Sequence, residues 1–434
     1  MFMKTVLADG QAEQQVIREM KARAAGARGD IEQIVRGVMA DVQQRALRGL
    51  RRQAAKRFDG KAPYIVEPEV LDDAYNACDP KLIAALEKAA ANIRDYHEQM
   101  LVKTWEWNRS GGETLGQTVR GLSRVGIYVP GGTAEYPSSV LMNAIPAKVA
   151  GVGELIMVTP PTENMSNEVL AAAKIAGVDT VIAIGGTQAI AALTYGAGFI
   201  PQVDKIVGPG NAFVAAAKKL AFGTVDIDMI AGPSEVLVIA DHTANPTYVA
   251  ADLLSQAEHD RLASAVLLTD SMAQAQAISC EMERQAKLLP RWDIIKESVA
   301  NYGCAIVFDD LKDACRMADV VAPEHLEIVT AAPRELLPYL HNAGAIFLGQ
   351  YAPEPLGDYM AGPCHVLPTS GTARFFSPLS TDTFLKKTSV IEYTRDALEG
   401  YAQDIIALAQ SEHLDAHANS IAVRFAEEND NENR

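Results

Sequence analysis

The chain has 434 residues, 48% of them hydrophobic and 22% charged, which predicts a globular protein with more than one folding unit. Its formal net charge of -16 disfavours nucleic acid as a partner. No apolar run approaches the roughly 18 residues that span a bilayer, the first ten residues do not resemble a signal peptide, and the five cysteines form no Cys-x-x-Cys pair. We therefore expect a cytoplasmic chain with free thiols and no membrane partner.

The first hundred residues predict helices. Asp41–Leu50 and Lys81–Lys88 carry apolar residues at spacings of three and four, with charged residues between them. The last 55 or so residues return to a helical pattern and end in the polar run Glu427–Arg434, which we expect to be frayed.

From about Arg124 the pattern changes to short apolar runs that alternate with alanine-rich helical stretches. Two sets of four such runs are expected to be strands: Val125–Gly132, Glu154–Pro161, Asp179–Gly186 and Asp204–Gly210, then Ser234–Asp241, Ser264–Asp270, Gly303–Asp310 and Gly344–Gly349. Nearly continuous apolar strands separated by helices are typical of a parallel sheet that is covered on both faces. The sequence therefore predicts an α/β fold with two doubly wound parallel sheets.

Glycine-rich turns follow several of these strands, at Pro130–Gly132, Gly185–Gly186 and Gly208–Asn211. Ligands of open parallel sheets bind beyond the carboxyl ends of the strands, and glycine lets a phosphate approach the backbone closely. None of the turns has the Gly-x-Gly-x-x-Gly pattern of dinucleotide-binding loops, so each turn alone is equally well explained as a tight strand-to-helix connection.

Four histidines lie in acidic or glycine-rich contexts. His259 follows a helix that we expect to begin at Asn245-Pro246, and Gln256 lies one turn before it on the same face. Pro323 is expected to place Glu324 and His325 at a helix start. The others are His365, shortly after Gly357–Tyr359, and the pair His413 and His417, expected at positions i and i+4 of one helix.

Imidazole and carboxylate groups together suit a divalent ion such as zinc. Taken singly, each histidine is more often a hydrogen-bonded structural residue, and the spacing does not show that these histidines converge. His97, His242 and His341 lack such a context and are expected to be structural or surface residues.

Eight segments together closely resemble the histidinol dehydrogenase family. They fall in the family's order between about Ile31 and Ala422, and they are Arg124–Gly132, Gly208–Asn211, Asp226–Glu235, Ala251–Asp260, Ala322–Glu327, Gly357–Tyr359, His365–Thr369 and Ala416–Asn419. Each motif is modest alone, but eight in register are specific.

The resemblance implies the following roles. One zinc ion per subunit would be held by Gln256, His259, Asp358 and His417. The substrate, L-histidinol, would contact Ser234, Gln256, His259, His325, Asp358, His365, Glu412 and His417. NAD would contact Tyr128, Gln188 and Asn211, and Glu324 and His325 would be the catalytic acid–base pair.

The resemblance also implies the domain organisation. Two incomplete Rossmann-like domains are expected, a larger one at 22–125 plus 236–378 with the metal and catalytic residues, and a second at 126–235 with the NAD contacts. An N-terminal arm would occupy 1–21, and a C-terminal helical segment, 379–434, would reach the partner subunit of a homodimer. Glu412 and His417 would then act in the partner's site.

One position departs from the family pattern. The family usually has asparagine before the His-Val-Leu-Pro-Thr run, and this chain has Cys364. A thiol is a weaker donor than an amide, so we expect Cys364 either to loosen substrate orientation or to change slightly which amino alcohol fits. Because no cysteine lies in a basic or helix-start setting, a covalent thiohemiacetal route is disfavoured, with Cys364 its one candidate.

The implied reaction is the NAD-dependent four-electron oxidation of L-histidinol to L-histidine through bound histidinaldehyde, at the end of histidine biosynthesis. His325 would exchange protons in both oxidations and Glu324 would activate water for the second. Two alternatives remain at this point: a sister dehydrogenase for another small polar alcohol, such as a sulfonated diol, and a zinc hydrolase or binding protein built on the same residues.

Overall fold

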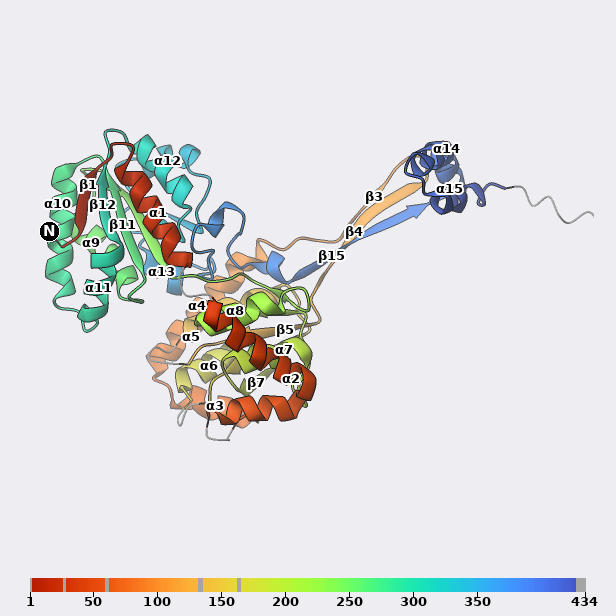
Figure 1. The fold of residues 1–434 in the computed structure, drawn as a ribbon, viewed down its shortest axis with the longest axis horizontal. Helices are drawn as coiled ribbons and strands as arrows, with labels where there is room; N and C mark the ends of the chain where they lie inside the picture. The colour runs from red at the N-terminus through yellow and green to blue at the C-terminus, as the bar shows by residue number, and fades with distance from the viewer. Residues whose placement is uncertain (1, 26–28, 59–61, 132–135, 162–164, 427–434) are drawn as a thin grey trace, which may run out of the picture. The chain divides into compact units, whose positions relative to one another are not determined.

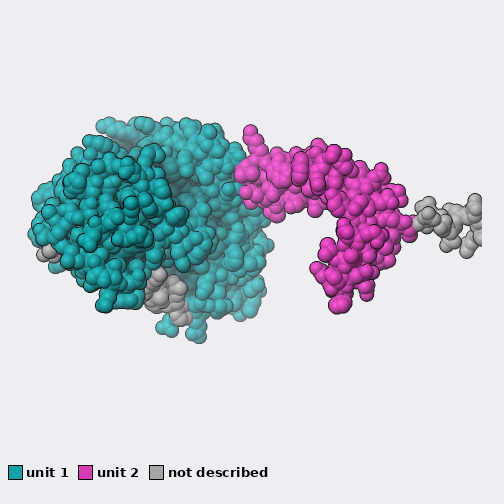
Figure 2. Space-filling model, turned by 90° about the horizontal axis from the view of Figure 1, so that it is seen from above, with its two compact units in different colours: residues 1–101, 121–384 teal, residues 102–120, 385–434 magenta. Residues whose placement is uncertain are grey.

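The computed structural model describes residues 2–25, 29–58, 62–131, 136–161 and 165–426. The chain divides into two compact units, shown in different colours in Figure 2. Unit 1 contains residues 1–101 and 121–384, and unit 2 contains residues 102–120 and 385–434. The predicted frayed run Glu427–Arg434 lies outside the described residues.

Unit 1 contains two six-stranded sheets. The first, here called sheet A, has its strands all parallel in the order β1 (Lys4–Leu7), β12 (Gly303–Val307), β11 (Ser264–Thr269), β10 (Glu235–Ala240), β13 (His325–Val329) and β14 (Ala345–Leu348). The second, sheet B, has the order β2 (Tyr64–Val66), β7 (Thr180–Ala183), β6 (Glu154–Thr159), β5 (Arg124–Tyr128), β8 (Lys205–Val207) and β9 (Asp226–Ile227). In sheet B only the edge strand β2 runs antiparallel among the described strands.

Sheet A is covered by helices on both faces (Figure 1). Along β10, Val236 and Val238 pack toward one group of helices and Leu237 and Ile239 toward the other, because successive side chains of a strand point to opposite faces. The first group is α9 (Pro246–Ala257), α10 (Met272–Ala286) and α11 (Trp292–Tyr302). The second group is α1 (Ala12–Ala25) and α12 (Leu311–Val321). This arrangement confirms the predicted doubly wound α/β fold.

Sheet B is also packed against helices. Its buried face, which includes Tyr128, Val158 and Ile182, packs against α2 (Gly29–Ala55), α7 (Thr187–Tyr195) and α8 (Ala212–Ala221). Four further helices belong to the same part of the chain: α3 (Pro68–Ala77), α4 (Pro80–Glu98), α5 (Pro137–Val149) and α6 (Asn167–Ala176). The predicted helix at 81–88 is confirmed within α4. The predicted helix at 41–50 is confirmed only on either side of Ala46, where α2 is kinked by a residue with a φ of 44°.

Unit 2 is built from two segments that are far apart in sequence. Its three-stranded sheet has the order β15 (Leu385–Tyr393), β4 (Glu113–Gly121) and β3 (Trp105–Asn108), and its helices are α14 (Arg395–Ser411) and α15 (Asp415–Ala422). The helical prediction for the end of the chain is therefore wrong at β15, whose residues include the β-branched Thr388, Val390 and Ile391.

No described helix is both long and apolar enough to cross a membrane.

Candidate active site

The C-terminal end of α9 presents the first two predicted ligands. Asn245 caps the helix by accepting a hydrogen bond from the Thr247 amide, as the Asn-Pro start predicts. Gln256 lies in the last turn, completely buried, and neither its Oε1 nor its Nε2 has a hydrogen-bond partner among the described residues. His259 follows directly after the helix and donates its backbone N–H to the Gln256 carbonyl, 3.2 Å away. A buried amide without a partner is costly, so this glutamine fits a site that holds a ligand.

Glu324 and His325 are brought together at the start of a strand. The prediction of a helix start at Pro323 is wrong, because α12 ends at Ala322, a residue in the left-handed conformation, and β13 begins at His325. The residues that follow are all buried and pair with β10, with His325 opposite Val236, so burial in the sheet favours the strand.

The position of this pair corrects a second expectation. His325 begins β13 and Glu235 begins β10, so the acid–base residues lie at the amino ends of the strands of sheet A rather than at their carboxyl ends. In sheet B the residues expected to contact NAD do lie at the carboxyl ends of strands, since Tyr128 ends β5 and Gln188 and Asn211 follow β7 and β8.

The His325 ring is enclosed and oriented by its neighbours. It is 4% exposed, and its Nδ1 lies 3.3 Å from the backbone carbonyl of Glu235, which can only accept a hydrogen bond. Its Nε2 lies 3.7 Å from Asp358 Oδ1 and has no hydrogen-bond partner among the described residues. The neutral ring with its proton on Nδ1 therefore has an open proton acceptor at Nε2.

The short helix α13 (Glu354–Tyr359) adds two carboxylates one turn apart. One ring nitrogen of His259, one carboxylate oxygen of Asp358 and one of Glu354 all lie within 4.8 Å of one another. Glu354 is held by the Ser255 hydroxyl, which donates to it over 2.9 Å, and its own backbone N–H donates to Glu327. The sequence analysis missed Glu354, although its i, i+4 spacing from Asp358 was a usable signal.

Burial and neighbouring charges change how these groups titrate. Burial raises the pKa of Glu324 to about 7, against the nearby positive charge that His325 can carry. For His325, burial lowers the pKa, but the carboxylates Glu324, Asp358 and Glu354 outweigh it and raise the pKa to about 10. A divalent ion next to Asp358 would act in the opposite direction on the histidine by repelling its proton.

His365 links this cluster to α5. Its Nδ1 lies 3.0 Å from the backbone carbonyl of Asp358, and its Nε2 lies 3.3 Å from the Ser139 hydroxyl. Next to it, the buried Cys364 thiol donates to the Met142 carbonyl over 3.2 Å, and burial raises its pKa to about 12. Ser234, half-buried, directly precedes β10. Ser139 follows the carboxyl end of β5, so the cluster and that edge of sheet B meet at these contacts.

The three predicted NAD residues lie at the carboxyl ends of sheet B strands. The Tyr128 hydroxyl accepts the Gly186 N–H over 3.0 Å, and Gln188 lies buried in the first turn of α7. Asn211 caps α8 by accepting the N–H groups of Phe213 and Val214. The nearby turn requires glycine, because a Cβ on Gly208 would lie 2.2 Å from the Tyr128 carbonyl oxygen. Gly132 of the first turn lies outside the described residues.

Glu412 and His417 belong to unit 2, where both are exposed. The expectation that His413 and His417 share one helix is wrong, because α14 ends at Ser411 and α15 begins at Asp415. His413 has a φ of 60°, its N–H donates to Gln410, and the Leu414 N–H donates to Ala409. This is the hydrogen-bond pattern of a Schellman cap, which stops the first helix.

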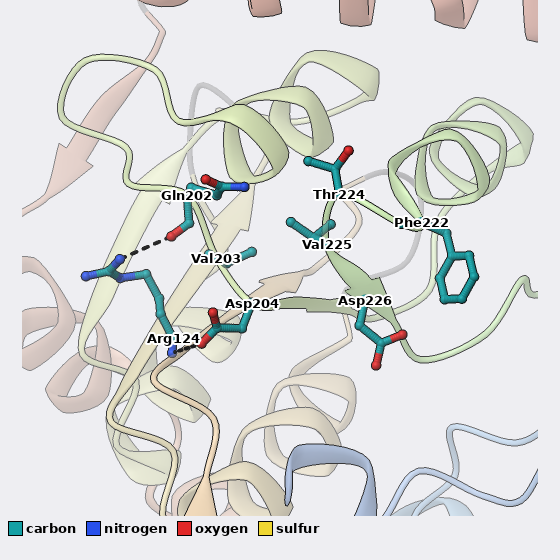
Figure 3. Close-up of a pocket in the computed structure, with 9 residues that line it drawn as sticks. Arg124, Gln202, Val203, Asp204, Phe222, Thr224, Val225 and Asp226 are labelled. Atoms are coloured by element: carbon teal, nitrogen blue, oxygen red, sulfur yellow. Dashed lines mark hydrogen bonds between the residues drawn. The ribbon is translucent and has the colours of Figure 1, made fainter. Parts of the chain in front are cut away.

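A cavity of about 440 Å³ adjoins the cluster and is lined by residues of α4, α5 and α13 together with Glu258, His259 and Arg291. A hollow of about 650 Å³ lies elsewhere, at the amino ends of β5, β8 and β9 (Figure 3). There the Arg124 side chain donates to the Gln202 carbonyl and pairs with Glu154. No predicted site residue lines it, so the smaller cavity is the one that belongs to the site.

Comparison with known proteins decides which family has this arrangement. The family model for histidinol dehydrogenase matches residues 21–425. The chain is 56% identical over 376 residues to the histidinol dehydrogenase of Heliobacterium mobile (85% of this chain, 88% of the relative), and 51% identical over 395 residues to that of Bacillus subtilis (90% and 92%). The chain belongs to the histidinol dehydrogenase family.

The solved structure of histidinol dehydrogenase from Elizabethkingia anophelis has the same fold, with a TM-score of 0.92 at 34% identity over 98% of each chain. The chain is therefore an NAD-dependent enzyme of histidine biosynthesis that oxidises histidinol to histidine, in a family that uses NAD and Zn²⁺. This membership confirms the predicted family, fold class, cofactors and reaction, and decides against the sister dehydrogenase, the hydrolase and the binding protein.

Proposed function

We propose that Glu324 and His325 are the acid–base pair of this histidinol dehydrogenase. The observation that carries the proposal is the His325 ring, which is held between carboxylates with an unpartnered, buried Nε2. Such a nitrogen can accept a proton from a substrate that binds beside it, because no protein group competes for its lone pair.

In the first oxidation, His325 Nε2 takes the proton of the substrate hydroxyl and leaves the oxygen with the electron pair that becomes part of the carbonyl. NAD, when bound, supplies the acceptor for the hydride that leaves carbon in each half of the reaction. His325 then returns the proton to solvent, so the amino alcohol becomes an amino aldehyde by losing one hydride and one proton.

The second oxidation needs a water molecule. Glu324 is 7% exposed, and its Oε2 accepts the Glu235 N–H over 3.0 Å, which fixes the carboxylate beside His325. Glu324 takes one proton from water as its oxygen adds to the aldehyde carbon, and His325 takes the hydroxyl proton of the hydrated aldehyde. The product is the carboxylate of histidine.

We assign the zinc ligands to Gln256, His259 and Asp358, with His417 of the partner subunit as the fourth. Zinc, when bound, supplies a positive centre that fixes the amine and imidazole nitrogens of histidinol. The donor set fits the ion, since an imidazole and two carboxylates, those of His259, Asp358 and Glu354, lie within 4.8 Å of one another, and the Gln256 amide in the turn before His259 is buried without a partner among the described residues. Glu354 adds a second carboxylate, which balances the charge of the ion.

Substrate and cofactor would contact further residues. Ser234 and His365, with Glu412 of the partner subunit, would bind the substrate. Tyr128, Gln188 and Asn211 would bind NAD. The contact between Ser139 and His365 supports this placement of substrate and NAD. It brings the segment that follows β5 of sheet B next to His365, a proposed substrate residue.

The proposal includes a homodimer in which residues 379–434 reach the partner. The part of unit 1 built around sheet A would carry the metal and the catalytic pair, and the part built around sheet B would carry the NAD contacts. The expected domain bounds need revision, because α2 and β2 belong with sheet B, and β1 and α1, expected to be an arm, belong with sheet A. The exposed positions of Glu412 and His417 on unit 2 support a role outside their own unit. The five unpaired thiols support a cytoplasmic location.

The roles of the pair are tested by Glu324→Gln and His325→Asn, assayed separately with histidinol and with histidinaldehyde. Glu324→Gln is expected to slow aldehyde oxidation by about 10²–10⁴-fold while the NADH formed in the first step remains, and His325→Asn is expected to slow both steps by a similar factor. Zinc content of both variants, measured by atomic absorption, is the control and should match that of the unmodified enzyme. Aldehyde oxidation by Glu324→Gln at the unmodified rate would disprove the water-activating role.

A further inference from the structure

Arg57 lies among the residues that we assign to NAD. It follows the end of α2 and is exposed. Its Nη1 is 3.5 Å from the point where a Cβ on Gly186 would lie, and the side-chain amide of Gln188 is 3.3 Å from that same point. The guanidinium carbon is 5.8 Å from the centre of the Phe213 ring, in the first turn of α8. Segments far apart in sequence therefore bring one cation to the carboxyl edge of sheet B.

Hydrogen-bond donors surround the same point. Gly186 is the N-cap of α7 and has no side chain to cap the helix, so no side chain accepts the amide N–H groups of the first turn at the cap. Gln188, in that turn, is 2% exposed, and its Nε2 has no acceptor among the described residues. The Tyr128 hydroxyl accepts the Gly186 N–H and keeps its own proton to donate. A buried amide that donates to nothing, beside an open helix start, indicates a missing acceptor.

We propose that Arg57, the first turn of α7 and the Gln188 amide form the subsite for the negatively charged diphosphate of NAD. The inference rests on the proposed placement of NAD at Tyr128, Gln188 and Asn211, and it adds the residue that supplies the charge. A guanidinium and a helix start are both favourable partners for phosphate oxygens.

The charge of the whole chain makes such a cation important. A formal net charge of -16 repels an anionic cofactor at long range, so binding requires a local positive group. Lys218, on the neighbouring helix α8, does not serve, because it is buried in an ion pair with Asp228.

The test compares Arg57→Gln with the unmodified zinc-loaded enzyme by calorimetry, using ADP-ribose and adenosine as probes. The dissociation constant for ADP-ribose is expected to rise on the order of tenfold, since one charge-assisted contact is lost, and that for adenosine is expected to stay the same. The KM for NAD should rise by a similar factor. Added salt should weaken ADP-ribose binding less in the variant than in the unmodified enzyme.

Arg48→Gln, at an exposed arginine of α2, the helix that Arg57 follows, is the matched control and should leave both dissociation constants unchanged. The proposal is overturned if Arg57→Gln binds ADP-ribose as tightly as the unmodified enzyme, or if it weakens adenosine equally, because the charge would then not act on the diphosphate.

A third variant separates this inference from the placement of NAD. Asn211→Asp keeps the oxygen that caps α8 but replaces the amide with a negative charge. Weaker ADP-ribose binding by Asn211→Asp and not by Arg57→Gln would leave the cofactor in place and remove the subsite. No weakening by either variant would mean that the cofactor binds elsewhere.

Discussion

In the proposed mechanism, protons are transferred by two adjacent side chains, Glu324 and His325, whose pKa values burial changes in opposite directions. Burial alone raises the pKa of Glu324 and lowers that of His325, because each group loses solvation of its charged form. The three carboxylates around His325 outweigh the effect of burial and raise the pKa of the imidazole. In the protein alone near neutral pH, His325 is therefore mainly an imidazolium and Glu324 is divided between its acid and carboxylate forms. The positive charge of a bound ion would shift both groups toward the neutral imidazole and the carboxylate that the reaction needs.

Cys364 stands where the family usually has asparagine, and its thiol is fully used by the backbone around it. It donates to the Met142 carbonyl and accepts the Val366 N–H over 3.4 Å. Because burial raises its pKa to about 12, the thiolate that a covalent route requires is absent at neutral pH.

We expect Cys364→Ala to keep catalysis within about tenfold of the unmodified enzyme, since only weak sulfur hydrogen bonds are lost. In the native protein an alkylating reagent should modify the exposed Cys280 first and leave Cys364 unreacted, as mass spectrometry of peptides can show. A loss of activity of roughly 10³-fold or more in Cys364→Ala, as for a removed nucleophile, would restore the covalent route.

At the level of the element, the C-terminal end of α9 carries two of the proposed zinc ligands, Gln256 and His259. Helix geometry places Gln256 and His259 on one side, and the chain turns out of the helix directly after Glu258. We expect Gln256→Leu and His259→Asn each to lower zinc content strongly and to remove the stabilisation that zinc gives against heat.

The measurement is the metal-to-protein ratio together with the change in Tm on adding a chelator. Tyr248→Phe, at the exposed start of the same helix, is the control and should respond to the chelator like the unmodified enzyme. Full zinc occupancy in both ligand variants would show that the ion is held elsewhere.

Local sequence signals predicted some elements well and others poorly. The start of α9 was predictable because Asn245 and Pro246 act within a single turn, and the central strands were predictable because burial on both faces demands apolar residues throughout. The strand at His325 was missed because Pro323 suits a helix start and a strand start equally well. β1 was missed because a four-residue edge strand gains its stability from β12, about 300 residues away, which no local pattern shows.

In the site, too, local sequence predicted some features, and others depend on contacts between distant segments. The residue types and the family motifs identified the candidate ligands. The spacing of Glu354 from Asp358 was visible in the sequence, but its closeness to His259 is created by the fold. The amino-end position of the acid–base pair was likewise invisible, because it follows from how sheet A pairs and not from any residue in the motif.

At the scale of the whole molecule, the proposed site is shared between two chains. His259→Asn and His417→Asn should each be inactive as pure proteins. If His417 serves the partner, mixed dimers carry one site with both substitutions and one intact site, so random subunit exchange should restore about a quarter of the unmodified activity.

The control is a mixture of His259→Asn with Gln256→Leu. Both substitutions affect residues that a subunit supplies to its own site, so no intact site forms and the mixture should remain inactive. No recovery in the first mixture, despite proven subunit exchange, would mean that His417 does not act in trans.

The two-part construction of unit 2 has a consequence for how the protein is made. β4 pairs at once with β3, but it finds its second neighbour β15 only after the intervening chain, up to residue 384, has been synthesised. At roughly 5–20 residues per second, β3 and β4 wait on the order of tens of seconds with one sheet edge unprotected. The exposed Trp105 and Trp107 on that hairpin make the interval a point at which chaperones would act during translation.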